Sequence, residues 1–140
     1  MNQKEIDVYE VITDDRAEHD IKRFVRKKRF LSLPLQVKEV IESCEKGNFS
    51  GDNILTYDEP TRIEVYKLRL PNPDANAGKS NGYRVVYAIA IERKLVTILT
   101  IYYKKEIAAL PESEIRGMLN AFIAKYLPEQ SETDDENTAE

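Results

Sequence analysis

Basic residues alternate with apolar or aromatic ones in three short segments of this chain. The segments are Tyr66–Leu70 (YKLRL), Gly82–Tyr87 (GYRVVY) and Leu99–Lys104 (LTIYYK). Each pattern is typical of a β-strand, in which successive side chains point to opposite faces. Lys67 and Arg69 therefore share one face of their strand. Cations repeated on neighbouring strands do not serve packing, so the pattern predicts a sheet surface that binds a polyanion.

A sheet and its covering helices must position these segments. Hydrophobic periodicity predicts an α+β domain with the order β-α-α-β-β-β-α, in which helices pack on a mostly antiparallel sheet. Residues 48–53 are expected to form a loop, and residues 71–82 a long connection. The predicted strands cover residues 6–13, 63–70, 83–91 and 95–103, and the predicted helices run to about residue 29, from 32 to 47 and from 111 to 126.

Composition places the chain among ordinary globular proteins. It has 140 residues, of which 33% are charged and 41% hydrophobic, so one domain is expected. No apolar run approaches the roughly 20 residues that span a bilayer, and no signal peptide is expected at the N-terminus. Cys44 is the single cysteine, which excludes an intramolecular disulfide. These features predict a cytoplasmic protein.

The formal net charge of −4 hides a basic region. Residues 129–140 contain six acidic and no basic residues, which leaves a net charge of +2 for residues 1–128. Residues 61–105 contain nine basic and three acidic residues, a net of +6. We therefore expect a folded domain at 1–128 and an acidic, disordered tail at 129–140. The tail serves solubility, or it folds back on the basic sheet and competes with an anionic partner.

The three segments, in this order and behind two helices, resemble the RelE/ParE superfamily of bacterial type II toxins, and most closely its RelE and HigB-like branch. The matching residues are Tyr66–Arg69, Gly78–Tyr87 and Leu99–Lys104. The resemblance covers about residues 6–126 and implies a RelE-like fold. RelE-type members cut mRNA in the ribosomal A site. The implied activity is therefore that of a ribosome-dependent endoribonuclease, or mRNA interferase, with no metal or other cofactor.

The resemblance also implies a catalytic set of Lys67, Arg69, Arg84 and Lys104. Cleavage of RNA by its own 2′-hydroxyl needs a base, stabilisation of charge at phosphorus and an acid for the leaving oxygen. Arg84 suits the phosphate because a guanidinium is planar and binds it in a bidentate manner. Lys67 is the candidate base, Arg69 a second charge stabiliser and Lys104 the candidate acid. Further RNA contacts are predicted at Lys22, Arg23, Arg26, Lys27, Lys79, Tyr102 and Tyr103.

Two departures from the family keep alternatives open. The second basic position, often lysine, is Arg69, and Leu110 stands near the place where one branch carries a tyrosine. One alternative is therefore a degenerate member that only binds RNA or a partner. Another is a ParE-like toxin that binds DNA gyrase and has no nuclease chemistry. The expected partners of the nuclease are a cognate antitoxin, the ribosome and mRNA, with no membrane, and the sequence does not indicate an oligomeric state.

Other residues that might suggest chemistry have plainer explanations. Lys79 lies in a Gly-Lys-Ser sequence, but the upstream glycine of a phosphate-binding P-loop is missing and no helix is predicted to follow. His19 is expected at the surface and Cys44 in the core. The acidic residues at the start of the first helix do not have metal-ligand spacing, and the basic residues of the strands, taken singly, are commonly only a solvated face.

Overall fold

Five strands and three α-helices make up residues 8–128, the part of the chain that the computed structural model describes. The strands are β1 (Glu10–Thr13), β2 (Asp52–Tyr57), β3 (Ile63–Leu70), β4 (Tyr83–Ala90) and β5 (Leu95–Tyr103). The helices are α1 (Asp15–Lys28), α2 (Leu33–Glu45) and α3 (Glu112–Tyr126), and two short 3₁₀ turns, η2 (Pro73–Ala75) and η3 (Lys79–Asn81), lie between β3 and β4. The acidic segment 129–140 and the first two residues of the predicted strand 6–13 lie outside the described residues.

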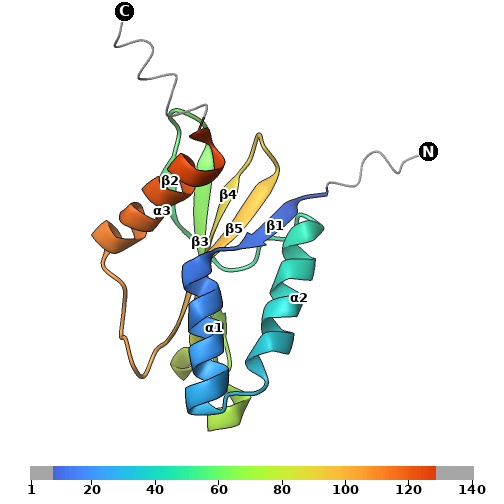
Figure 1. Cartoon of the computed structure of the whole chain (residues 1–140), viewed down its shortest axis with the longest axis vertical. Coiled ribbons are helices and arrows are strands. Elements are labelled where there is room, and N and C mark those ends of the chain that lie inside the picture. The colour runs from blue at the N-terminus through green and yellow to red at the C-terminus, as the bar shows by residue number, and fades with distance from the viewer. Residues whose placement is uncertain (1–7, 129–140) are drawn as a thin grey trace, which may run out of the picture.

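The strands form one sheet in the order β1-β5-β4-β3-β2 (Figure 1). β1 runs parallel to β5, and every other neighbouring pair is antiparallel. The predicted α+β class and mostly antiparallel sheet are therefore confirmed. The bounds of β3 and β5 are those predicted, because both strands have the unbroken apolar or alternating character of sheet interiors.

The strand β2 was not predicted. The sequence pattern predicts a loop over residues 48–53, but the structure places Asp52 and Asn53 at the start of this edge strand. The pairing with β3 is irregular between Asn53 and Leu55, and a bulge of this kind interrupts the alternation by which strands are recognised. An edge strand also has only one neighbour, so its sequence is less constrained by burial.

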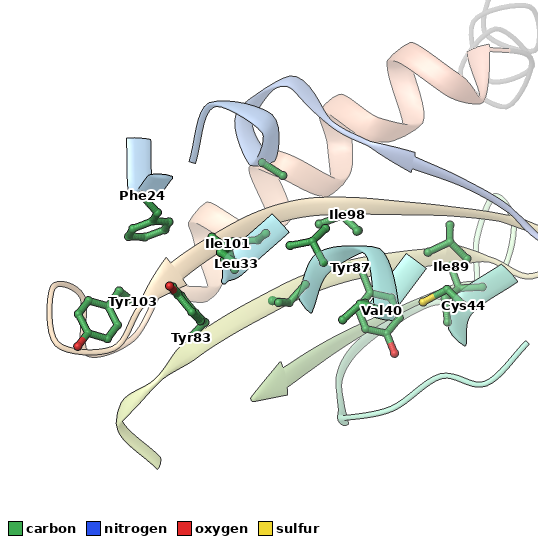
Figure 2. Packing of buried hydrophobic residues seen from close by; sticks show 14 of the residues in the cluster. Phe24, Leu33, Val40, Cys44, Tyr83, Tyr87, Ile89, Ile98, Ile101 and Tyr103 are labelled. Atoms are coloured by element: carbon green, nitrogen blue, oxygen red, sulfur yellow. The ribbon is translucent and has the colours of Figure 1, made fainter. Parts of the chain in front are cut away.

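The helices α1 and α2 cover one face of the sheet (Figure 1). An aromatic group lies at one end of this layer, as Figure 2 shows for Phe24, Tyr83 and Tyr103. The ring centroids of Phe24 and Tyr83 are 5.5 Å apart and those of Phe30 and Tyr103 are 5.4 Å apart, both with edge-to-face geometry. Such pairs stabilise a core beyond the area they bury. Cys44 is buried in the same layer, as predicted.

The helix α1 also protects the free edge of β5. β1 pairs with β5 only as far as Ile98, so the next residues of β5 have no strand on that side. There Asp20 accepts a hydrogen bond from the hydroxyl of Thr100 at 2.7 Å and one from the backbone N–H of Ile101 at 3.0 Å. The carboxylate therefore replaces a strand partner.

The helix α3 covers the opposite face of the sheet. Leu119 and Phe122 of this helix pack against Ile63 and Val65 of β3 and against Val86 of β4. None of the helices within residues 8–128 is long and apolar enough to cross a membrane.

Candidate nucleic-acid interface

A row of polar side chains crosses three strands of the sheet. Arg69 of β3 is opposite Arg84 of β4, and Arg84 is opposite Tyr102 of β5. Residues opposite each other in an antiparallel pair project from the same face. Because Val86 and Tyr102 belong to the core cluster under α3, this face is the α3 side. Lys67 projects from it as well, two residues before Arg69.

The end of β3 that carries these cations lies beyond the cover of α3. The side chains of β3 on this face become progressively more exposed along the strand: Ile63 and Val65 are fully buried, Lys67 is half-buried and Arg69 is exposed. The same face of one strand is therefore core at one end and surface at the other. The prediction that Lys67 and Arg69 share a face of the sheet agrees with this register.

Arg84 is only 3% exposed, although it is charged. Its Nη1 donates to the carbonyl oxygens of Lys79 at 2.9 Å and of Tyr83 at 3.2 Å, and its Nη2 donates to that of Ser80 at 3.0 Å. The guanidinium thereby fixes the turn η3 against the start of β4. Burial, and secondly the like charge of Arg69, lower the pKa of Arg84 from its ordinary value.

The cations of the row have no acidic partner within residues 8–128. No carboxylate of these residues lies within 4.0 Å of the charged nitrogens of Lys67, Arg69 or Arg84, although Asp52 is opposite Lys67 in the sheet. A buried charge without a counter-ion is unfavourable. Of these three cations only Arg84 is buried, and carbonyl oxygens rather than a carboxylate surround its guanidinium.

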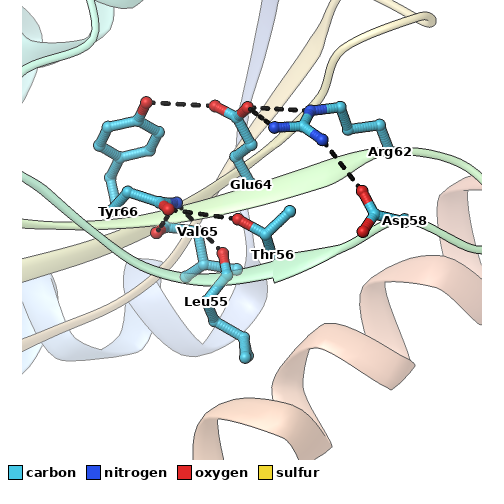
Figure 3. A network of polar contacts seen from close by, with 8 residues as sticks. Leu55, Thr56, Asp58, Arg62, Glu64, Val65 and Tyr66 are labelled. Atoms are coloured by element: carbon cyan, nitrogen blue, oxygen red, sulfur yellow. Dashed lines mark hydrogen bonds and ion pairs between the residues drawn. The ribbon is translucent and has the colours of Figure 1, made fainter.

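An arginine at the other end of β3 is neutralised by acids. Arg62, at the entry to β3, pairs with Asp58 at 2.9 Å and with Glu64 at 3.0 Å, and Glu64 in turn accepts a hydrogen bond from the hydroxyl of Tyr66 (Figure 3). Burial, followed by this contact with Glu64, raises the pKa of Tyr66. Acids therefore compensate Arg62 at the start of β3, whereas Lys67 and Arg69 further along the same strand have no such partner within residues 8–128.

The remaining candidate residues separate into two groups. The backbone N–H of Lys104 donates to the carbonyl oxygen of Gly82 at 2.9 Å, which extends the β4–β5 ladder by one residue. Alternation then places Lys104 on the side of Tyr102. Tyr103 is on the opposite face, where it packs against Phe30 and Tyr83. The structure therefore places Lys104 and Tyr102 on the face of the row, where Tyr102 is buried in the cluster under α3, and it places Tyr103 in the core on the opposite face.

The predicted basic face of α1 is a separate surface. Its side chains surround a hollow of about 340 Å³ that is lined by His19, Lys22, Arg23, Arg26 and Lys27. His19 is exposed, as predicted, and so are Lys22, Arg26 and Lys27. Arg23 is different, because it pairs with Glu106 at 2.7 Å. Glu106 also pairs with Lys28 at 3.2 Å, and its pKa is lowered, mainly by the hydrogen bond from Arg23.

Sequence reasoning missed two parts of this region. Glu106 neutralises a predicted RNA contact, and the sequence gives no sign that the loop after β5 returns to α1. Gly82 is the second, because a Cβ there would lie 2.1 Å from the carbonyl oxygen of Leu70. Only glycine permits that close approach of the connection to β3. The sequence does contain a cue for this close approach, because a glycine stands directly before the predicted strand that carries Arg84.

Comparisons with known proteins give one match. No family model matches the chain, and no curated protein matches it. A solved structure of E. coli toxin RelE, a double arginine-to-alanine mutant in the free state, is similar to this chain with 22% sequence identity and a TM-score of 0.42. The similarity covers 72% of this chain and 88% of that chain.

Proposed function

We propose that this protein is the toxin of a type II toxin–antitoxin system and that it cleaves mRNA on the ribosome. The observation that carries the proposal is the row of Arg69, Arg84 and Tyr102, flanked by Lys67, on the α3 face of the sheet, where the exposed Arg69 lies beside the buried Arg84 and Tyr102. The residues whose motifs resemble RelE-type toxins are those that the strand register brings together. The expected antitoxin would cover this basic surface.

The chemistry follows from the position of each cation. The scissile phosphate would lie on the exposed Arg69 and approach the N–H groups of Arg84 that are not used in its three hydrogen bonds, of which two go to η3 and one to Tyr83. Lys67, on the same face, would take the proton of the 2′-hydroxyl when its amine is unprotonated, and Lys104, as an ammonium, would give a proton to the leaving 5′-oxygen. The two arginines cannot exchange protons in practice, so they stabilise charge. Tyr102, whose pKa burial raises, would stay neutral and orient the phosphate by hydrogen bonding.

The test is mRNA cleavage in a purified translation system, with the wild-type chain and the variants Lys67→Ala, Arg84→Ala and Lys104→Ala. We expect cleavage within translated codons by the wild type. Each variant should lose about 10²–10³-fold in rate, which is the usual cost of removing one group that stabilises the transition state. Lys38→Ala is the matched control, because Lys38 is exposed on α2, outside the row.

Arg84→Ala needs a control for folding, since Arg84 also holds η3. Arg69→Gln leaves those hydrogen bonds intact, and the unfolding transitions of both variants should be compared with that of the wild type. Full activity in all the variants would refute the catalytic assignment. No cleavage by the wild-type protein would refute the nuclease and favour gyrase binding or a non-catalytic role.

A further inference from the structure

A cavity of about 370 Å³ lies between α2, the loop that follows it and the last residues of β3. Its walls are mixed, because Val40 and Leu68 are apolar whereas Gln36 and Ser43 are polar. Tyr87 also lines it, and Figure 2 shows Val40 beside Tyr87 in this layer. The volume falls in the range of pockets that hold small organic ligands, roughly 300–1,000 Å³. It is sufficient for one nucleobase with its ribose.

An open edge of the sheet forms one side of this cavity. β2 pairs with β3 only as far as Lys67, so the following residues of β3 have no strand beside them. The side-chain amide of Asn53, in β2, donates to the carbonyl oxygen of Val65 at 3.1 Å, and peptide groups two residues apart point the same way. The N–H and C=O of Arg69 therefore point into the open edge. A nucleobase can form hydrogen bonds along one of its edges with a donor and an acceptor that lie side by side, as these two groups do.

Gln36 adds an acceptor that has no partner. Its Nε2 donates to the carbonyl oxygen of Pro71 at 2.9 Å, which fixes the orientation of the amide. Its Oε1 is buried and makes no hydrogen bond with any residue in the described part of the chain. Buried acceptors are nearly always satisfied, and an unsatisfied one is unfavourable. The amino group of a nucleobase would supply the missing donor.

Two residues connect this cavity to the basic row. Arg69 lines the cavity, and its guanidinium projects from the α3 side of the same strand. Lys79 also lines the cavity, while its carbonyl oxygen anchors Arg84. We infer that the cavity holds one unpaired base of the RNA whose neighbouring phosphate lies on Arg69, and that it contributes sequence preference. This inference rests on the proposed function for the identity of its ligand.

The test uses the full chain labelled with ¹⁵N and a set of trinucleotides carrying 2′-O-methyl groups, which cannot be cleaved. We expect saturable shifts of the amide signals of Ser43, Leu68 and Arg69, with one base preferred. Gln36→Met should weaken binding of the preferred trinucleotide about fivefold, the factor that one hydrogen bond supplies. Lys38→Met, which removes an exposed polar group from the same helix outside the cavity, should leave the affinity unchanged.

Shifts confined to Lys67, Arg84 and Tyr102 would overturn the inference. A second result would also overturn it: the amide signals of the cavity do not shift with any trinucleotide but do shift with an extended peptide. That result would indicate that a peptide strand adds to the edge of β3. Cleavage in the translation system is measured separately. Cleavage without cavity shifts would refute the base site and retain the nuclease, whereas cavity shifts without cleavage would support the base site and refute the nuclease.

Discussion

The two faces of the central sheet use the same strands for opposite purposes. On the side of α1 and α2, β4 presents Tyr83 and Tyr87, both fully buried. On the side of α3, the same strand presents Val86 beneath the helix and Arg84 beyond the packed cluster. The first face is covered along its length, and the second only in part. The extent of the covering helix therefore decides where a strand stops being core and becomes a binding surface.

The largest effect on stability should come from replacing one phenylalanine by alanine in each of the two cores, the one under α1 and α2 and the one under α3. Phe24→Ala and Phe122→Ala should each lower the free energy of unfolding by about 3–5 kcal/mol, because both leave a cavity. Phe24 should cost more, since its ring contacts those of Phe30 and Tyr83, whereas Phe122 has an aromatic contact with Tyr126. Urea unfolding measures both. A larger loss from Phe122→Ala would contradict the view that the fully covered face dominates stability.

A charge at the edge of β5 and a charge on the α3 face should differ in what their removal does to folding. Asp20→Ala leaves the hydroxyl of Thr100 and the N–H of Ile101 without their acceptor, so we expect a loss of about 1.5–3 kcal/mol. Arg69→Ala removes an exposed cation that has a like charge beside it, and stability should change by less than about 0.5 kcal/mol. Thermal unfolding of the two variants gives the comparison. Equal losses would show that Arg69 has a structural role.

The salt dependence of RNA binding should distinguish cations that are paired with an acid from cations that are not. Each phosphate contact to a single strand contributes about 0.7 to the slope of log K against log salt concentration. Arg69→Gln should reduce that slope by about this amount in RNA binding, because Arg69 has no acid partner in the described residues. Arg23→Gln should change it less, because Glu106 already neutralises Arg23. Fluorescence anisotropy at several salt concentrations measures both slopes, and a larger effect of Arg23→Gln would place the RNA on α1 instead.

Much of the scaffold was predictable from the sequence because it depends on local patterns. The bounds of β3 follow from the alternation Ile63–Leu70, and those of β5 from a continuous apolar run. The strand β2 was missed because it is an edge strand with an irregular register, so its pattern is weak. Alternation also placed Lys67 and Arg69 on one face without knowledge of the tertiary structure.

Only those features of the candidate site that follow from alternation within a single strand could be predicted from the sequence. The opposition of Arg69, Arg84 and Tyr102 needs the register between strands that the sequence does not specify. The separation of Tyr102 from Tyr103 follows from alternation, but choosing the face of each requires the position of α3. The pairing of Arg23 with Glu106 joins residues 83 positions apart. No local pattern predicts such a contact.

The smallest expected effect concerns Glu106, which ties α1 to the loop after β5. Glu106→Gln should lower stability by about 0.5–1 kcal/mol at pH 7, a modest amount because Glu106 and Arg23 are partly exposed, at 26% and 35%. The pKa of Glu106 is lowered in the folded protein. Its contribution is therefore present above the unfolded pKa near 4.5 and is lost as the pH falls through the lowered folded value.

Unfolding of the wild type and of Glu106→Gln, measured at pH 7 and in acid, tests this sign. The stability difference should shrink in acid, and a difference that does not depend on pH would contradict the role of the carboxylate. The same variant should also release Arg23 and Lys28 from their partner. If α1 contributes to RNA binding, the salt slope of Glu106→Gln should then rise, because two compensated cations become available. An unchanged slope would indicate that α1 does not contribute to RNA binding.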